Sequence, residues 1–293
     1  MSFDLYFSRD NNTVPPVDEL TRYFAEQTFV QRIEMENGGI QFLYSNEQTG
    51  VYCTFFFDRE TDDEDPSLFA KLGLSFNLNY LRPTFFAFES MPLVENFCRY
   101  FDLKVENPQE DRITNGDSDS LIQSWRNHNR NAVHAASQSD ANITLRYFPE
   151  DRATSWWRYT QEVQSLRENL TEDLFVPSII FLSSPEDQLI TMIVWPDAIA
   201  QLFPDSDYIY VEREKKKLLG GTAKQTGVIA YSDVMKAIAD QIEEYPTRSG
   251  SIRYLPVKNR GPVAYAVNRL VLTPVELSQY TRILPESLHD VKL

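Results

Sequence analysis

The residues from 71 to 80, KLGLSFNLNY, constrain the fold more than any other stretch of the chain. Every second residue from Leu72 to Tyr80 is apolar, and the residues between them are small or polar. Successive side chains of a strand point to opposite faces, so the pattern predicts a strand with one buried face and one wet face. Burial on one side only is typical of antiparallel sheets.

Further strands are predicted on either side of this stretch. Residues 51–57 (VYCTFFF) precede it and residues 84–88 (TFFAF) follow it. A helix is expected from Ser90, with Val94, Phe97, Cys98 and Phe101 on its buried side. Because strands outnumber helices and mostly adjoin in sequence, we expect an α+β fold with helices packed on one face of a mainly antiparallel sheet.

The chain is predicted to form two sub-domains of this kind. Residues 107–120 (NPQEDRITNGDSDS) are polar and contain Pro and Asn-Gly, and residues 121–136 have the pattern of a helix. We therefore predict an N-terminal α+β domain over 1–108, a linker and connecting helix over 109–140, and a C-terminal α+β domain over 141–293.

Four segments of the second half give local expectations. The apolar spacing from Trp156 to Leu170 predicts a helix, and residues 264–272 resemble a strand. Residues 220–227 lack the Lys of a phosphate-binding loop, so we expect a surface loop there. Residues 273–276 (TPVE) match a capping box, which predicts a short final helix.

The charge of the chain limits its partners. Its 293 residues carry a net charge of −15 at pH 7. A surface of that sign repels nucleic acid and anionic membranes and favours basic partners, although solubility alone explains an acidic composition equally well. The N-terminus lacks the basic region of a signal peptide and no run is long enough to span a membrane, so we expect a cytoplasmic protein.

The sequence favours a protein that is not an enzyme. His128 and His134 are six residues apart, about 240° around a helix, which is wrong for holding one metal ion. Cys53 and Cys98 lie among apolar residues and are expected to be buried free thiols. We predict no metal and no cofactor, and the open alternative is an enzyme whose carboxylates are brought together by folding.

Two acidic segments are the candidate contacts for a partner. Residues 58–65 (DRETDDED) hold six carboxylates and one Arg, and residues 183–188 contain two more carboxylates. A charged loop can steer a basic partner at long range, but a solvated loop without a binding role has the same composition. The candidate residues are Asp58, Asp62, Asp63, Glu64, Asp65, Glu186 and Asp187.

Three short segments of the chain resemble a known class of proteins. FDLYF at 3–7, NLNYLRPTFF at 77–86 with the following ESMP, and DYIYVERE at 207–214 are similar to segments of bacterial immunity proteins. These guard a cell against polymorphic toxins, including type VI secretion effectors with restriction-endonuclease-like nuclease domains. The resemblance implies a soluble α+β protein without catalytic residues.

The resemblance also implies a mode of action. Such proteins work by stoichiometric binding, and a nuclease toxin has a basic surface because it must hold phosphates. We therefore expect an immunity protein that binds and neutralises a cognate toxin, with a nuclease as the expected target. The alternative is a non-inhibitory adaptor or chaperone-like binding protein of a secretion system.

Overall fold

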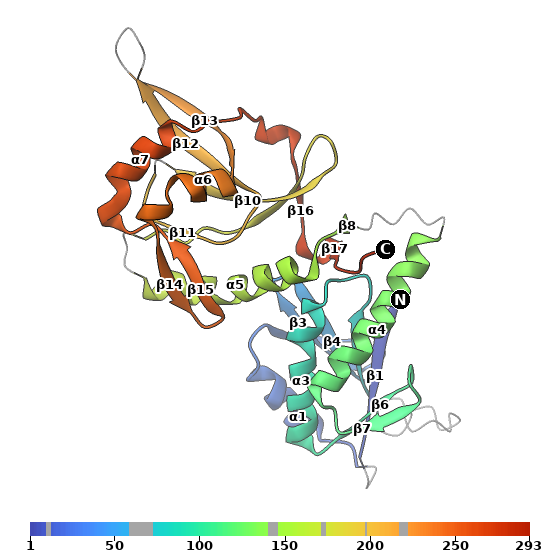
Figure 1. Ribbon diagram of the computed structural model, residues 1–293. Helices are drawn as coiled ribbons and strands as arrows, with labels where there is room; N and C mark the ends of the chain where they lie inside the picture. Colours follow the sequence, from blue (N-terminus) through green and yellow to red (C-terminus); the bar gives the residue numbers. More distant parts are fainter. Residues whose placement is uncertain (10–12, 59–72, 140–145, 171–173, 197, 217–221) are drawn as a thin grey trace. The chain divides into compact units, whose positions relative to one another are not determined.

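The computed structural model describes residues 1–9, 13–58, 73–139, 146–170, 174–196, 198–216 and 222–293. The chain forms two compact units (Figure 1). Unit 1 consists of Met1–Ala153 and Glu286–Leu293, and unit 2 consists of Thr154–Pro285. Both units combine helices with mainly antiparallel sheets, which confirms the predicted α+β class and the division into two.

Unit 1 is organised around a seven-stranded sheet with the order β2-β3-β4-β5-β1-β6-β7. Every pair of neighbouring strands in it is antiparallel. The predicted alternation is confirmed in β5, where Leu74, Phe76 and Leu78 are buried and the residues between them are half-buried. The strands are β1 (Ser2–Ser8), β2 (Val30–Glu34), β3 (Ile40–Asn46), β4 (Val51–Phe57), β5 (Leu74–Asn79), β6 (Lys104–Asn107) and β7 (Arg112–Thr114).

In the described part of unit 1, three helices pack on the buried face of this sheet. They are α1 (Val17–Ala25), α3 (Phe85–Phe101) and α4 (Ser118–Ser137), and Figure 1 shows α3 and α4 lying over the sheet. The ring of Phe24 in α1 stacks on Phe42 at 4.2 Å, and Phe97 in α3 meets Phe7 edge-on at 5.0 Å. Aromatic pairs of this kind add packing energy beyond the area that they bury.

A buried carboxylate fastens the β3–β4 hairpin to α3. One oxygen of Glu89, Oε1, accepts hydrogen bonds from Tyr44 Oη at 2.8 Å, Asn46 Nδ2 at 2.8 Å and Thr49 Oγ1 at 2.9 Å. Glu89 is only 9% exposed, so these donors replace the water that a carboxylate normally binds. The hairpin and the helix are therefore held in register by one side chain.

The end of the chain returns to unit 1. Strand β17 (Leu288–His289) pairs in parallel with β8 (Arg146–Tyr147), and the next residue, Asp290, accepts a 2.6 Å hydrogen bond from the backbone N–H of Thr84. Thr84 is the N-cap residue of α3. The Asp290 side chain therefore satisfies one of the backbone donors that the start of a helix leaves unpaired.

The units therefore have different boundaries from the predicted domains 1–108 and 141–293. The segment 109–140, predicted to be a linker with a connecting helix, belongs to unit 1. Its polar residues form β7 and the start of α4, where the Asp117 carboxylate accepts a 2.9 Å hydrogen bond from the Ser120 N–H. The helix expected over 121–136 is confirmed within α4. It does not connect two domains but packs against α3, which buries its apolar side with Trp125.

The described residues of unit 2 form two sheets. A five-stranded sheet has the order β13-β12-β10-β9-β16, in which only β10 and β12 are parallel, and a three-stranded sheet has the order β11-β15-β14. The strands are β9 (Ile180–Ser183), β10 (Leu189–Pro196), β11 (Leu202–Phe203), β12 (Tyr208–Lys216), β13 (Thr222–Ala230), β14 (Glu243–Thr247), β15 (Gly250–Tyr254) and β16 (Thr281–Ile283).

The helices of unit 2 are short except for the first. Helix α5 (Glu150–Asn169) confirms the expected helix near Trp156, and the boundary between the units lies in its first turn. Helices α6 (Tyr231–Ala237) and α7 (Arg260–Asn268) follow, with 3₁₀ turns at Ala239–Gln241, Val257–Asn259, Leu277–Gln279 and Pro285–Ser287. The core is centred on Trp195, whose indole N–H donates to Ile199 O at 2.8 Å.

Several local expectations are wrong. Residues 84–88 begin helix α3 instead of forming a strand, and residues 264–268 belong to helix α7. Short apolar runs fit a buried helix as well as a buried strand, and the packing partners decide. The expected loop at 220–227 is strand β13 from Thr222 onwards, and the capping box at 273–276 is followed by a single 3₁₀ turn.

Candidate partner interface

The predicted acidic segment of unit 1 starts and ends at neighbouring strands. Asp58 is exposed at the end of β4, and its backbone N–H donates to Gly73 O at 2.8 Å. Gly73 has φ +61°, and a Cβ there would lie 2.2 Å from Asp58 O, so only glycine fits this close approach. Asp58, the first residue of the segment, therefore lies beside the start of β5. Its other candidate residues, Asp62, Asp63, Glu64 and Asp65, lie outside the described residues.

The second predicted acidic segment lies in unit 2 and builds its own turn. The Asp187 carboxylate accepts a 2.8 Å hydrogen bond from Ser183 Oγ, and Glu186 accepts one of 2.9 Å from Ser184 Oγ. Asp187 has φ +60°, a conformation that Asp tolerates better than most residues. These two carboxylates therefore support the β9–β10 turn, and the structure does not bring them into the same unit as Asp58.

A surface that the sequence reading did not single out lies on the second face of the unit 1 sheet. We call it the polar face. Its side chains are half-buried, whereas the residues that alternate with them along each strand are buried. They are Ser2, Asp4, Tyr6 and Ser8 of β1, Gln41, Leu43 and Ser45 of β3, Tyr52 and Phe56 of β4, Ser75, Asn77 and Asn79 of β5, and Lys104 and Glu106 of β6.

Hydrogen bonds across the strands hold the polar face in place. Asp4 lies opposite Asn77, and Asn77 Nδ2 donates to Asp4 Oδ1 at 2.6 Å. Asn79 Nδ2 donates to the Tyr52 hydroxyl at 3.0 Å. Side chains directly opposite each other in a sheet stabilise it when they pair in this way. The face is thus a fixed surface that presents carboxylate, amide and aromatic groups together.

The carboxylates around this face repel one another. Burial, and then the neighbouring Asp111, raise the pKa of Glu106. Burial, and then the charge of Asp4, raise the pKa of the Tyr6 hydroxyl, and Tyr6 lies directly opposite Glu106. Both shifts disfavour negative charge on these two side chains. Two cations lie on or beside the same face: Lys104 alternates with buried residues in β6 as Glu106 does, and Arg82 Nη2 donates to the Tyr52 hydroxyl at 2.8 Å.

Negative charge is unevenly divided between the two units. Unit 1 contains 27 of the 43 acidic residues and 14 of the 28 basic residues, which gives it a net charge of −13. Unit 2 contains 16 acidic and 14 basic residues and has a net charge of −2. The predicted acidic character of the chain is therefore a property of unit 1.

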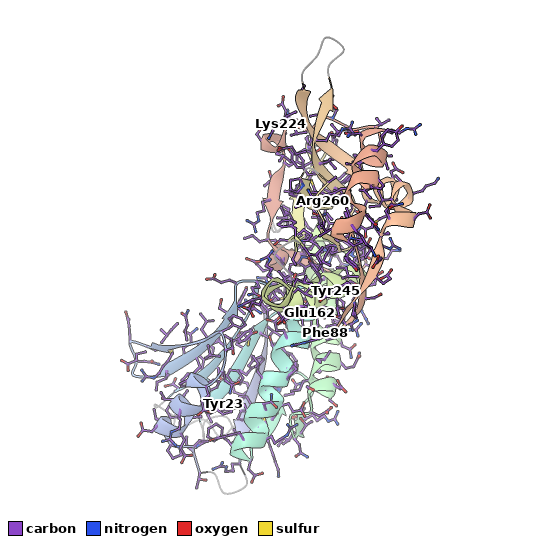
Figure 2. The ribbon with its side chains drawn as sticks, turned by 90° about the vertical axis from the view of Figure 1, so that its left-hand side faces the viewer. Tyr23, Phe88, Glu162, Lys224, Tyr245 and Arg260 are labelled. Carbon is purple, nitrogen blue, oxygen red and sulfur yellow. The ribbon has the colours of Figure 1, made fainter. Side chains whose placement is uncertain are left out.

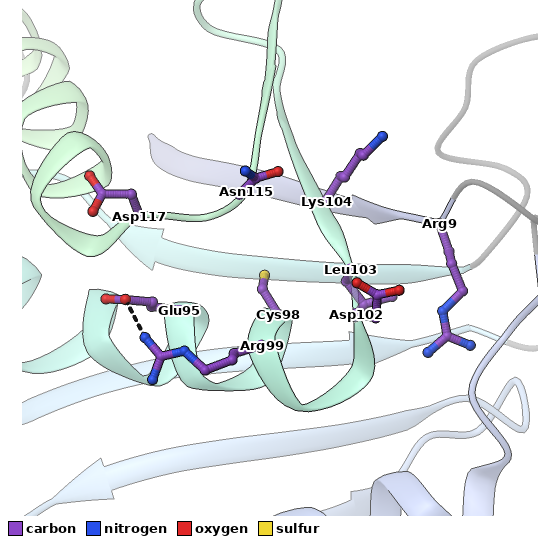
Figure 3. Close-up of a pocket in the computed structure, with 9 residues that line it drawn as sticks. All are labelled: Arg9, Glu95, Cys98, Arg99, Asp102, Leu103, Lys104, Asn115 and Asp117. Carbon is purple, nitrogen blue, oxygen red and sulfur yellow. Dashed lines mark hydrogen bonds and ion pairs between the residues drawn. The ribbon is translucent and has the colours of Figure 1, made fainter.

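A cavity in unit 1 lacks the features of a catalytic site (Figure 3). Burial, and then the charge of Glu95, raise the pKa of the Cys98 thiol to about 12, so the thiol stays protonated at neutral pH. Glu95 pairs with Arg99 at 2.6 Å, and Asp117 caps α4. Hydrogen bonds from Ser118 and Ser120 lower the pKa of Glu95 and of Asp117, opposite to the shift that a general acid needs.

Comparisons with protein-family models, curated proteins and solved structures found no match for this chain. In the part of the chain that the structure describes, none of the helices combines the length and the apolar character needed to cross a membrane.

Proposed function

We propose that the chain is an immunity protein that binds and neutralises a cognate secreted toxin, with a nuclease as the expected target, by stoichiometric contact through unit 1. The observation that carries this proposal is the concentration of negative charge on unit 1, where Asp4 and Glu106 lie on the polar face and Glu110 and Asp111 at its rim. A nuclease presents basic groups to hold phosphates, and an acidic protein surface competes for the same groups. Such a protein acts in the cytoplasm of the cell that it protects.

The rigidity of unit 1 supports a binding role. The polar face is backed by the aromatic core under the sheet, in which Phe55 contacts both Phe76 at 5.0 Å and Phe97 at 5.2 Å. A surface that is ordered before binding loses little conformational entropy on association. Its exposed rim also carries Glu110 and Asp111, in the turn between β6 and β7, where long-range steering of a basic partner is most effective.

The test is protection by charge variants of the full chain. The toxin encoded beside this chain's gene is expressed in bacterial cells together with Glu106→Gln/Glu110→Gln/Asp111→Asn. A matched control, Glu168→Gln/Asp233→Asn/Asp240→Asn, removes the same charge from unit 2. We expect the unit 1 variant to bind the toxin about tenfold more weakly, mostly through slower association, and the control to bind normally.

Two outcomes contradict the proposal. Equal affinity of both variants would exclude the polar face as the interface. Complex formation without any rescue of cell growth by the wild-type chain would favour a non-inhibitory adaptor or chaperone-like protein instead.

A further inference from the structure

A cavity in unit 2 has the opposite charge to the surface of unit 1. It measures about 560 Å³ and lies between strands β12 and β13 and the segment that follows α7. Its polar lining consists of Arg213, Lys224, Gln225, Thr226, Asn268 and Arg269. Three of these are cationic and none is a carboxylate, although the protein as a whole is strongly acidic.

Arg213 is the central residue of this cavity. It is only 8% exposed, and its Nη1 donates to Val267 O at 2.7 Å and to Leu270 O at 3.1 Å. These two bonds cap the C-terminal end of α7 and account for one nitrogen of the guanidinium. Burial lowers the pKa of Arg213, because a buried cation loses hydration.

The other edge of the Arg213 guanidinium has no partner within the described residues. Its Nε is buried without a hydrogen bond, and Nη2 makes none either. Nε and Nη2 lie on the same side of the guanidinium, and this edge forms two parallel hydrogen bonds to a carboxylate or a phosphate. A buried donor that is left unpaired costs free energy, so an acceptor that reached this edge would remove that cost.

Two further cations lie at the same cavity. Arg269 is exposed, with its guanidinium 5.7 Å from the centre of the Tyr265 ring, and Lys224 pairs with Glu212 across β12 and β13. The pairing leaves Lys224 partly neutralised, so Arg213 and Arg269 supply most of the attraction. A phosphate carries up to two negative charges at neutral pH, which matches two arginines better than a single carboxylate does.

We propose that this cavity binds a small phosphate-bearing molecule, with the guanidinium of Arg213 holding the phosphate and Arg269 adding charge at the entrance. The volume is within the range of small-molecule sites and exceeds that of a phosphate alone, so the remainder of the ligand also fits. The site lies in unit 2 and does not depend on the toxin-binding role proposed for unit 1.

The test is calorimetric titration of the full chain with inorganic phosphate, with acetate as a parallel carboxylate probe. Phosphate is expected to bind saturably and more tightly than acetate. Arg213→Lys keeps the charge but loses the two-pronged edge, and we expect about tenfold weaker binding or more. Arg269→Ala changes an exposed residue without a role in α7 capping, and we expect a loss of roughly threefold to tenfold.

The matched control is Arg260→Ala, which removes an exposed arginine from the start of α7, away from the cavity lining (Figure 2). It should bind phosphate like the wild type. Circular dichroism is used to check that each variant is folded. If Arg213→Lys does not fold, Arg269→Ala still tests the proposal. The proposal is overturned if phosphate shows no saturable binding, if acetate binds as tightly as phosphate, or if all three variants lose affinity equally.

Discussion

The two units use charge in opposite ways within one fold class. Unit 1 buries a carboxylate, Glu89, and surrounds its sheet with further acidic groups, whereas unit 2 is nearly neutral and buries a cation, Arg213. Glu89 is held by three side-chain donors, but Arg213 keeps one edge unpartnered among the described residues. A buried charge with a full set of partners holds the structure together, whereas one with an incomplete set leaves a position that a water, an ion or a ligand can fill.

The largest expected effect comes from removing the Glu89 carboxylate, which joins the β3–β4 hairpin to α3. Glu89→Ala leaves three buried donors without an acceptor, so we expect a loss of about 3–5 kcal/mol in the free energy of unfolding. Glu89→Gln keeps an oxygen acceptor and should lose clearly less. Urea denaturation measures both. Equal stability of the wild type and Glu89→Ala would show that Glu89 does not hold the hairpin.

The next effect concerns the chain end that closes unit 1. Asp290→Ala removes the acceptor for the Thr84 N–H at the start of α3, and we expect a loss of about 1–2 kcal/mol, typical of a helix cap. Asp290→Asn retains an oxygen and is the control. Amide hydrogen exchange should increase in α3 and not in α7, and faster exchange in unit 2 alone would contradict the assignment of the tail to unit 1.

The buried His289 lies in unit 1, so acid should weaken this unit. His289 is 1% exposed, and burial lowers its pKa below the ordinary value. The folded state then binds fewer protons than the unfolded state, so stability present above about pH 6.5 is lost as the pH falls below it. We expect a loss of about 1 kcal/mol between pH 7 and pH 5.5.

Replacing the imidazole tests this pH dependence. His289→Gln should flatten the dependence of the melting temperature on pH over this range, while His134→Gln, at a half-exposed position of α4, should not. Identical slopes for the wild type and His289→Gln would show that another group is responsible for the acid sensitivity.

The smallest effect is expected at the acidic turn of unit 2. Asp187→Asn keeps an acceptor for Ser183 and a side chain that tolerates φ +60°, so the stability should change by less than about 0.5 kcal/mol. Affinity for the toxin should stay unchanged, because this carboxylate serves the turn. A fall in affinity as large as that of the Glu106 variant set would bring unit 2 into the interface.

The sequence predicted the features that depend on a regular pattern. The alternation in β5 gave the one-sided antiparallel sheet, and the spacing around Trp156 gave α5. Both patterns are long enough to distinguish a period of two from a period of 3.6 residues. The expectation that Cys53 and Cys98 are buried free thiols is also confirmed.

Features that depend on tertiary packing could not be predicted in the same way. Residues 84–88 are apolar in both possible structures, and their burial under α4 and the tail favours a helix. Asp290 lies 206 residues from the N–H that it caps. Such long-range contacts have no local signal in the sequence.

The sequence predicted the charge of the candidate interface but not its position. Glu106 and Asp111 are ordinary residues of a polar stretch, and only the pairing of β6 with β1 places Glu106 opposite Tyr6. Glu186 and Asp187 looked equivalent to the first acidic segment, because the sequence does not reveal that serine hydroxyls of the same turn bind them. Composition indicated the sign of the surface charge. Only the strand register showed where on the fold that charge lies.

The central claim is that the negative charge of unit 1 attracts a basic toxin, and the salt dependence of the affinity tests it most directly. We expect the dissociation constant of the wild-type complex to rise at least tenfold between about 50 mM and about 500 mM salt, because salt screens charge attraction. The unit 2 control variant should show the same slope and the Glu106→Gln/Glu110→Gln/Asp111→Asn variant a clearly smaller one. A dissociation constant indifferent to salt, or equal slopes for all three proteins, would contradict the account.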